Sequence, residues 1–202
     1  QSAYYAQGLK PERILAQRKL IQDLQKKMTI KIFHGIESDI LADGGLDFPD
    51  VMLDKLDIIV ASVHSRLKQD REAMTKRMLT AASNPLTTII GHPTGRLILD
   101  RPPSDYDIEA LIMTAKAHET VLELNAHPHR LDLGYEHLLL AKEKGVLIAI
   151  NPDAHSVNGF KDLYYGVLVA RRAGIIPDDV LNCLSLNDMK KWLSARKKKM
   201  SL

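Results

Sequence analysis

Five short apolar runs recur along this chain, and segments with the length and composition of helices lie between them. Each run is rich in β-branched residues and stops at polar or turn-forming residues, as the strands of a parallel sheet do. The runs are Thr29–Ile40, Leu56–His64, Thr87–His92, Val121–Asn125 and Val146–Ile150. Because strand and helix alternate, the sequence predicts an α/β fold whose parallel sheet is joined by helical crossovers.

The intervening segments carry the usual signals of helix ends. A proline stands in the first turn of the first segment, Asp105 can cap another, and Gly145 closes the one that ends at Lys144. The predicted helices are Pro11–Met28, Gln69–Ala82, Asp105–His118, Tyr135–Lys144, Tyr164–Arg172 and Pro177–Lys199, and Gln1–Gly8 is a predicted loop. Since a helix comes first, we expect the chain to open inside a fold.

Polar side chains that can bind metal stand where the predicted strands end. They are Glu37, His64, His92 and the pair Asp153 and His155, which extended backbone would point the same way, while Asn125 marks the end of the remaining strand. Strand ends of a parallel α/β barrel meet at one rim. An acid can instead cap a helix, and a histidine can be merely hydrogen-bonded. Several such endings together nevertheless favour a shared metal site, and oxygen and nitrogen donors without sulfur suit Zn, Mn or Fe.

Composition narrows the class of protein. With 45% hydrophobic and 26% charged residues the chain is globular, and no apolar run approaches the roughly 18 residues that span a bilayer. The start has no signal-peptide pattern, so we expect a soluble, cytoplasmic protein. The single cysteine, Cys183, excludes an internal disulfide and a thiolate zinc site. The net charge of +3 is slight, and the basic cluster Arg196–Lys199 is interpreted as a solvated helix end.

A cluster of metal ligands favours hydrolysis as the reaction. A divalent cation can lower the pKa of bound water from 15.7 to about 7, and a pair of cations can hold both oxygens of a phosphoester displacement. The chain has no Gly-x-Ser-x-Gly nucleophile elbow, Walker loop or dinucleotide fingerprint. Metal-activated water is therefore the favoured nucleophile.

Several motifs, in order along the chain, resemble the PHP (polymerase and histidinol phosphatase) domain at the C-terminus of bacterial family X DNA polymerases. They are Gly35–Leu41, Val60–Ser65, Gly91–Arg96 and Asp153–Ser156, with Arg101–Pro103 and Arg130–Leu133 as further matches. The resemblance implies a distorted (βα)7 barrel of the TIM-like kind with a trinuclear metal centre. It also implies phosphoester hydrolysis, as a 3′ to 5′ exonuclease or DNA 3′-end-processing enzyme.

The resemblance further implies roles for individual residues. Glu37 matches the family's bridging carboxylate, His64 and His92 match its partner histidines, and Asp153 and His155 match the last ligand pair. Glu37, Asp153 and His155 would then be catalytic, with Mn or Zn as the cation.

Four residues near the strand ends keep alternative interpretations. Arg96 and Arg130 can bind a substrate phosphate, or each can pair with a loop acid. His127 and His129 stand where family members commonly show Asn and Tyr. Since they flank Pro128 beyond a strand end, we expect them to support the site and not to bind metal.

The family's first two strand units have no match in this chain. Residues 1–202 are therefore expected to be the C-terminal portion of a single PHP domain, about five of seven βα units, with polymerase domains further upstream in cis. Only the site of Glu37, His64 and His92 would be complete, so one of up to three cations should persist and hydrolysis should be impaired. The open sheet edges of such a portion should promote self-association.

The predicted substrate is a DNA 3′ end, acted on through the parent protein. A small-molecule phosphatase of the histidinol phosphate type is the first alternative. A non-catalytic module that only supports a polymerase is the second.

Overall fold

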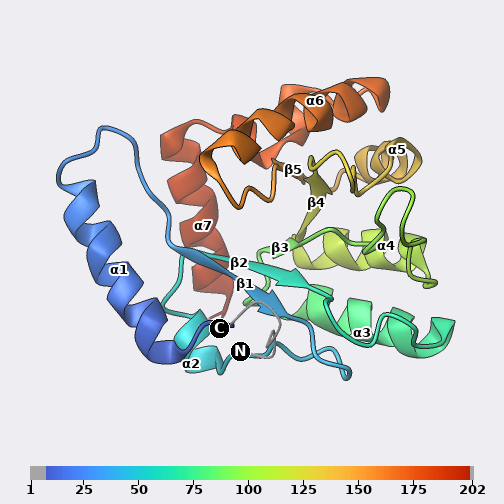
Figure 1. Cartoon of the computed structure of the whole chain (residues 1–202), viewed down its shortest axis with the longest axis horizontal. Helices are drawn as coiled ribbons and strands as arrows, with labels where there is room; N and C mark the ends of the chain where they lie inside the picture. The colour runs from blue at the N-terminus through green and yellow to red at the C-terminus, as the bar shows by residue number, and fades with distance from the viewer. Residues whose placement is uncertain (1–7, 201–202) are drawn as a thin grey trace.

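The structure, a computed structural model, describes residues 8–200 of the chain (Figure 1). The loop predicted at Gln1–Gly8 lies outside the described residues, apart from Gly8 itself. Within the described part, none of the helices has both the length and the apolar character that a membrane span requires.

A five-stranded parallel sheet forms the centre of the molecule, with the strands side by side in sequence order. The strands are β1 (Gly35–Asp39), β2 (Ile58–Ser62), β3 (Ile89–Ile90), β4 (Val121–Asn125) and β5 (Ile148–Asn151). The predicted mixed α/β class and parallel sheet are therefore confirmed. Closure into a barrel stays a prediction, as does the placement of two further strand units before residue 1.

Helices and short 3-10 turns connect the strands. They are α1 (Pro11–Gln25), α2 (Asp50–Leu53), α3 (Arg71–Ser83), α4 (Ile108–His118), α5 (Tyr135–Glu143), η2 (Val157–Asp162), α6 (Leu163–Arg172), η3 (Pro177–Asp179), η4 (Leu181–Cys183) and α7 (Leu186–Met200). The N-cap predicted at Asp105 is wrong. Asp107 caps α4 instead, because its carboxylate accepts from the amide of Ala110.

The two faces of the sheet differ in chemistry. One face packs on α3 to α6, which follow one another around it in Figure 1. Its strand residues in that core are Ala61, Ile90, Leu122, Leu124, Ile148 and Ile150. On the other face Ile89, Val121 and Ala149 pack against Leu181 and against residues of α7. Because side chains alternate along a strand, Glu37, Glu123 and Asn125 also lie on this second face, nearer the carboxyl ends.

The C-terminal helix is packed more tightly than its charge suggests. Arg196 is buried, and its guanidinium donates to the carbonyls of Thr87, His118 and Glu119. The interpretation of this cluster as a solvated helix end is therefore wrong for Arg196, since orphan carbonyls of α4 and of the segment before β3 need donors. Lys197 and Lys198 are exposed, as expected.

The edge of β5 is partly covered by the segment before α7. Val180 forms a parallel bridge with Ile148, and the Asn182 amide both donates to and accepts from the backbone of Ile150. The expectation of an open edge at this end of the sheet is therefore wrong in part, because a side chain supplies the missing hydrogen bonds.

Candidate metal centre

Three of the predicted ligands meet at the carboxyl ends of β1, β2 and β3. The Nε2 atoms of His64 and His92 lie 3.3 and 3.2 Å from the same oxygen of Glu37, Oε1. The imidazole rings are 5.1 Å apart and meet edge to face. One ligand atom of each residue lies within 4.8 Å of the others. Residues far apart in the sequence are thus brought to one point.

Different local structures aim these three side chains. Glu37 lies in the middle of β1, and its carboxylate remains 41% exposed on the open side of the group. His64 and His92 follow β2 and β3 by two residues each. His92 has a φ of 25°, in the left-handed range that non-glycine residues rarely adopt, and its ring is buried. The strained turn after β3 therefore points the His92 imidazole back toward β1.

The electrostatics of the group favour positive charge between its acids. Burial alone would raise the pKa of the Glu37 carboxyl, but hydrogen bonds from His64 and His92 outweigh it and lower that pKa well below its ordinary value. Burial would lower the pKa of His64, yet hydrogen bonds to Asp39 and Glu37 raise it to about 9. In the metal-free protein, a proton on His64 therefore supplies charge that a cation can replace.

Asp39 is a functional candidate that the sequence analysis missed. Its Oδ1 lies 2.5 Å from Nδ1 of His64, and its side chain is buried. A carboxylate on the far nitrogen fixes the tautomer and orientation of a ligating histidine. The signal was present in the sequence, because Glu37 and Asp39 are two residues apart in one strand and so share a face.

The donors of this group fit a divalent cation. One carboxylate oxygen and two imidazole nitrogens are a known protein ligand set for Zn, and the same donors suit Mn. Among the described residues, the buried Nδ1 of His92 has no hydrogen-bond partner, while its Nε2 faces Glu37. The geometry therefore leaves Nε2 of each histidine directed at the shared carboxylate, where a cation would be held.

Asp153 and His155 are not brought into this group. His155 is 87% exposed, and its Nδ1 lies 2.8 Å from the carbonyl oxygen of Asp153. The Asp153 carboxylate accepts from the Asn125 amide at 3.1 Å and lies 3.8 Å from Nε of Arg130. Extended backbone was expected here, but Asp153 has a φ of 52°, so the alternation on which the pairing rested ends at Asn151. Their roles as ligands stay predictions.

The two arginines lie in the loops next to this end of the sheet. Arg96 donates through Nε to the Arg130 carbonyl at 2.8 Å, and also to the Leu131 carbonyl. Arg130 lies beside Asp153, and its NH1 is buried without a hydrogen-bond partner among the described residues. Arg96 thus holds the loop that carries Arg130. Phosphate binding by either residue stays a prediction.

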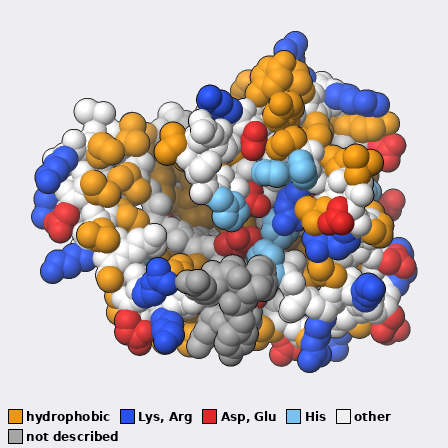
Figure 2. Space-filling model, viewed as in Figure 1, with side chains coloured by type: hydrophobic (Ala, Val, Ile, Leu, Met, Phe, Trp, Pro, Cys, Tyr) orange, Lys and Arg blue, Asp and Glu red, His pale blue; other side chains and the backbone are white. Residues whose placement is uncertain are grey.

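His127 and His129 contact each other. Their rings are 5.4 Å apart, and the His129 amide donates to Nδ1 of His127 at 3.3 Å. Neither belongs to the metal-ligand group found in the described part of the chain. Figure 2 shows histidine side chains beside acidic ones near the middle of one face of the molecule.

A buried acid, Glu123, lies between the two parts of the site. It is 4% exposed, and its carboxylate accepts from the His92 amide, the Asn125 side chain and the Asn151 side chain. Burial raises the pKa of this carboxyl, while the nearby His92 and the hydrogen bonds oppose the rise. Glu123 was not predicted as a site residue, although it is the one acid within the run Val121–Asn125 and could have been found on that ground.

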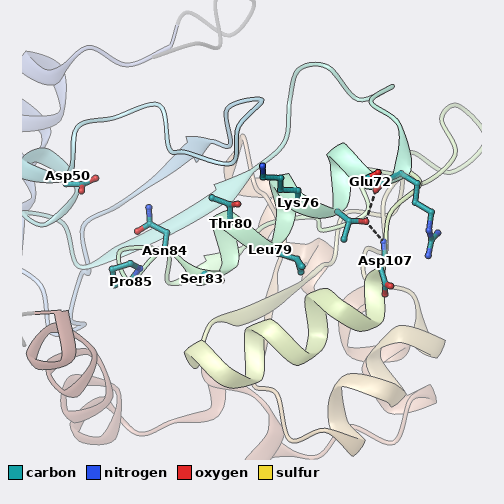
Figure 3. A pocket seen from close by; sticks show the side chains of 11 residues that line it. Asp50, Glu72, Lys76, Leu79, Thr80, Ser83, Asn84, Pro85 and Asp107 are labelled. Atoms are coloured by element: carbon teal, nitrogen blue, oxygen red, sulfur yellow. Dashed lines mark hydrogen bonds between the residues drawn. The ribbon is translucent and has the colours of Figure 1, made fainter.

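A large groove lies elsewhere, along α3 (Figure 3). It has a volume of about 990 Å³, and Thr75, Leu79 and Pro85 are among its lining residues. Thr75 there accepts from the amide of Asp107. The metal-ligand group found among residues 8–200 does not line this groove, so the chemistry of the strand ends and not the size of the hollow locates the candidate site.

Comparison with known proteins gives relatives of two kinds. The chain is 44% identical over 189 residues to the DNA polymerase/3'-5' exonuclease PolX of Bacillus subtilis, a match that covers 93% of this chain. It covers 33% of PolX, so the chain spans about a third of that protein. No family model matches the chain.

The second kind of relative carries the name Probable phosphatase. One from a Thermoanaerobacter species is 34% identical over 184 residues, which is 85% of this chain and 71% of the relative. Another, from Caldanaerobacter subterraneus, is 29% identical over 181 residues, or 85% of this chain and 68% of the relative. The similarity therefore extends over most of both chains.

Proposed function

Since this chain belongs to the PHP family, together with these phosphatase relatives and the matching third of PolX, we propose that it is a metal-dependent phosphoesterase. The observation that carries the proposal is the convergence of Glu37, His64 and His92 on one point at the strand ends. Three protein ligands that leave a coordination position open are typical of catalytic zinc sites.

The proposed roles follow from the position of each side chain. Glu37, His64 and His92 would hold a Mn or Zn cation, and Asp39 keeps the His64 ring oriented through Nδ1. When bound, such a cation lowers the pKa of a water ligand and neutralises charge on a phosphoryl oxygen.

The other predicted residues would act around this point. Asp153 and His155 would supply further ligands and take part in catalysis, and Arg96 and Arg130 would bind the phosphate. For Asp153 the support is its contact with Asn125, which also contacts Glu123 behind His92. In the same proposal, the chain is a portion of a single PHP domain and works with polymerase domains in cis.

We propose DNA 3′ ends as the substrate, because the PolX relative is named a 3'-5' exonuclease. The test uses the complete parent protein, because hydrolysis by residues 1–202 alone is expected to be impaired. It compares release of nucleotides from a 3′-recessed duplex with release of phosphate from histidinol phosphate, each with added Mn or Zn. Faster turnover of the duplex is expected. His64→Ala should abolish hydrolysis, whereas His118→Ala, at an exposed histidine that ends α4, should leave it unchanged.

A small-molecule phosphatase is the second candidate, favoured by relatives named Probable phosphatase of which this chain covers 71%. Preference for histidinol phosphate over the duplex would establish that reading in place of the first. A chain that hydrolyses neither substrate and takes up no Mn or Zn would instead be a non-catalytic module.

A further inference from the structure

Glu123 occupies an unusual place for a carboxylate. It is the middle residue of β4, whose five residues are all buried, and it lies on the face that carries Glu37. Burying an acid is unfavourable unless donors surround it. Here the donors that face it are the amide of His92 at 2.5 Å, the Asn151 side chain at 2.8 Å and the Asn125 side chain at 3.3 Å.

Each of these donors belongs to the end of a strand. His92 follows β3, Asn125 ends β4 and Asn151 ends β5. The neighbouring Gly91 lies close to β2, because a β-carbon there would lie 2.3 Å from the Ser62 hydroxyl and 2.7 Å from a methyl group of Val60. The carboxylate of Glu123 therefore accepts hydrogen bonds from residues at the ends of three adjacent strands.

The same acid is connected to both parts of the candidate centre. On one side it holds the backbone of His92, whose φ of 25° would otherwise be unfavourable. On the other side, the Asn125 amide that contacts Glu123 also donates to Asp153 at 3.1 Å. We infer that Glu123 is a positioning residue, which sets the direction of His92 and, through Asn125, the position of the Asp153 carboxylate.

This inference rests on the proposed metal centre and adds a residue that would not touch the cation. A purely structural acid would lower stability when replaced and leave cation affinity alone. A positioning acid would weaken affinity in a protein that still folds, since groups behind the ligands typically change metal affinity by about 10- to 100-fold.

The test is Glu123→Gln, which keeps the size of the side chain but places an N–H group among donors. Zn affinity is measured by competition with a chromophoric chelator, and folding by circular dichroism. We expect the Zn dissociation constant to rise by about 10- to 100-fold. In ¹H–¹⁵N spectra of the metal-free protein, the His92 backbone amide and the Asn125 side-chain amide should both move.

Asp57→Asn is the matched control, because Asp57 also accepts from a backbone amide, that of His34, but near the start of β1. It should leave the Zn dissociation constant within about twofold of wild type. If Glu123→Gln does not fold, Asn151→Ala removes one donor and should weaken Zn binding several-fold. A folded variant, of either kind, with wild-type Zn affinity and an unmoved His92 signal would overturn the inference.

Measuring Zn affinity and hydrolysis separately distinguishes a failure of this inference from a failure of the proposed function. A complete parent protein that binds Zn but hydrolyses no phosphoester would refute the function alone, because hydrolysis by residues 1–202 by themselves is expected to be impaired. Hydrolysis by the wild type, with equal Zn affinity in Glu123→Gln, would refute the positioning role alone.

Discussion

The group of Glu37, His64 and His92 and the end of β5 that carries Asp153 and His155 contrast in how their side chains are held. In the first, both histidines contact one carboxylate oxygen, and Asp39 fixes the outer nitrogen of His64. In the second, His155 is 87% exposed, and its Nδ1 lies 2.8 Å from the carbonyl oxygen of Asp153 in the same loop. The same residue types in the two regions thus differ in exposure and in the side chains that hold them.

The difference shows that preorganisation comes from the residues behind the ligands. Asp39 and Glu123 are both buried, and each bonds directly to a residue of the first group. Asp153 is held by Asn125 at 3.1 Å and has Arg130 at 3.8 Å. The acid nearest to the His155 ring is Asp153 itself, 3.9 Å from Nδ1, compared with 2.5 Å between Asp39 and His64. We therefore expect the first group to bind a cation more tightly than the second.

The largest expected effect is a contrast between His92→Ala and Asp153→Ala. His92→Ala removes one of three converging ligands, so the Zn dissociation constant should rise by at least about 100-fold. Asp153→Ala should change it by less than about tenfold. Isothermal titration with Zn measures both, and equal losses in the two variants would mean that the two regions form one site.

Asp39→Asn should have the next largest effect. The variant keeps the shape of the side chain but loses the charge that orients His64, so Zn affinity should fall by about 10- to 100-fold. The matched control is Asp43→Asn, in the exposed turn after β1, where the carboxylate accepts from the Gly45 amide and does not belong to the metal-ligand group. Equal affinities for wild type and Asp39→Asn would remove Asp39 from the account.

The pH dependence of stability should distinguish the first group from the rest of the molecule. The pKa of His64 is raised from 6.5 to about 9. Protonated His64 therefore contributes fully to the free energy of unfolding below pH 6.5, and this contribution is lost as the pH rises through 9. The pKa of Glu37 is lowered from 4.5, so its contribution is complete above pH 4.5 and is lost in acid.

The metal-free protein should therefore lose thermal stability between pH 6.5 and 9, as followed by differential scanning calorimetry. Added Zn should reverse the trend, because deprotonated His64 is the ligand. Asp39→Asn should flatten the metal-free decline. A melting temperature that is constant or rises across this range without metal would contradict the assigned protonation of His64.

The smallest expected effect concerns the edge of the sheet at β5. Asn182→Ala removes the two hydrogen bonds to the backbone of Ile150, which should lower the free energy of unfolding by about 1 to 2 kcal/mol. The exposed strand edge should also increase self-association, measured by sedimentation at several concentrations. A variant as stable and as monomeric as wild type would show that Asn182 does not protect this edge.

Much of the fold could be predicted because buried strands leave strong patterns. The run Val121–Asn125 has the bounds of β4, since every residue in it is buried. The strand predicted over Thr29–Ile40 is wrong in its first half, because only Gly35–Asp39 forms a strand. There, the Gln25 side chain bonds the backbone of Ile30 and Ile32, which removes the need for a strand partner.

The C-terminal prediction failed for a similar local reason. Pro177–Lys199 was expected to be one helix, but two 3-10 turns precede α7. Ser185 accepts from the amide of Asp188 and so starts the helix there. Short polar side chains decide such boundaries, and their partners are not evident from periodicity.

In the candidate site too, some residues could be predicted from the sequence pattern and others depend on contacts made in the fold. Strand-end position identified His64 and His92, because parallel strands deliver their ends to one edge. Glu37 was found although it lies in the middle of β1 and not at its end. The sequence marks Asp39 and Glu123 as candidates, but their contacts with His64 and His92 depend on which strands are neighbours. The turn at Asp153 depends on a φ of 52°. Neither neighbour order nor a left-handed residue is determined by spacing in the sequence.

The most direct test of the central claim is the position of a bound cation in crystals of this chain grown with Zn. Anomalous scattering at the Zn absorption edge locates the ion without reference to activity. The account predicts a peak about 2.0 to 2.2 Å from ligand atoms of Glu37, His64 and His92. A peak held by Asp153 and His155 alone, or no peak at saturating Zn, would contradict it.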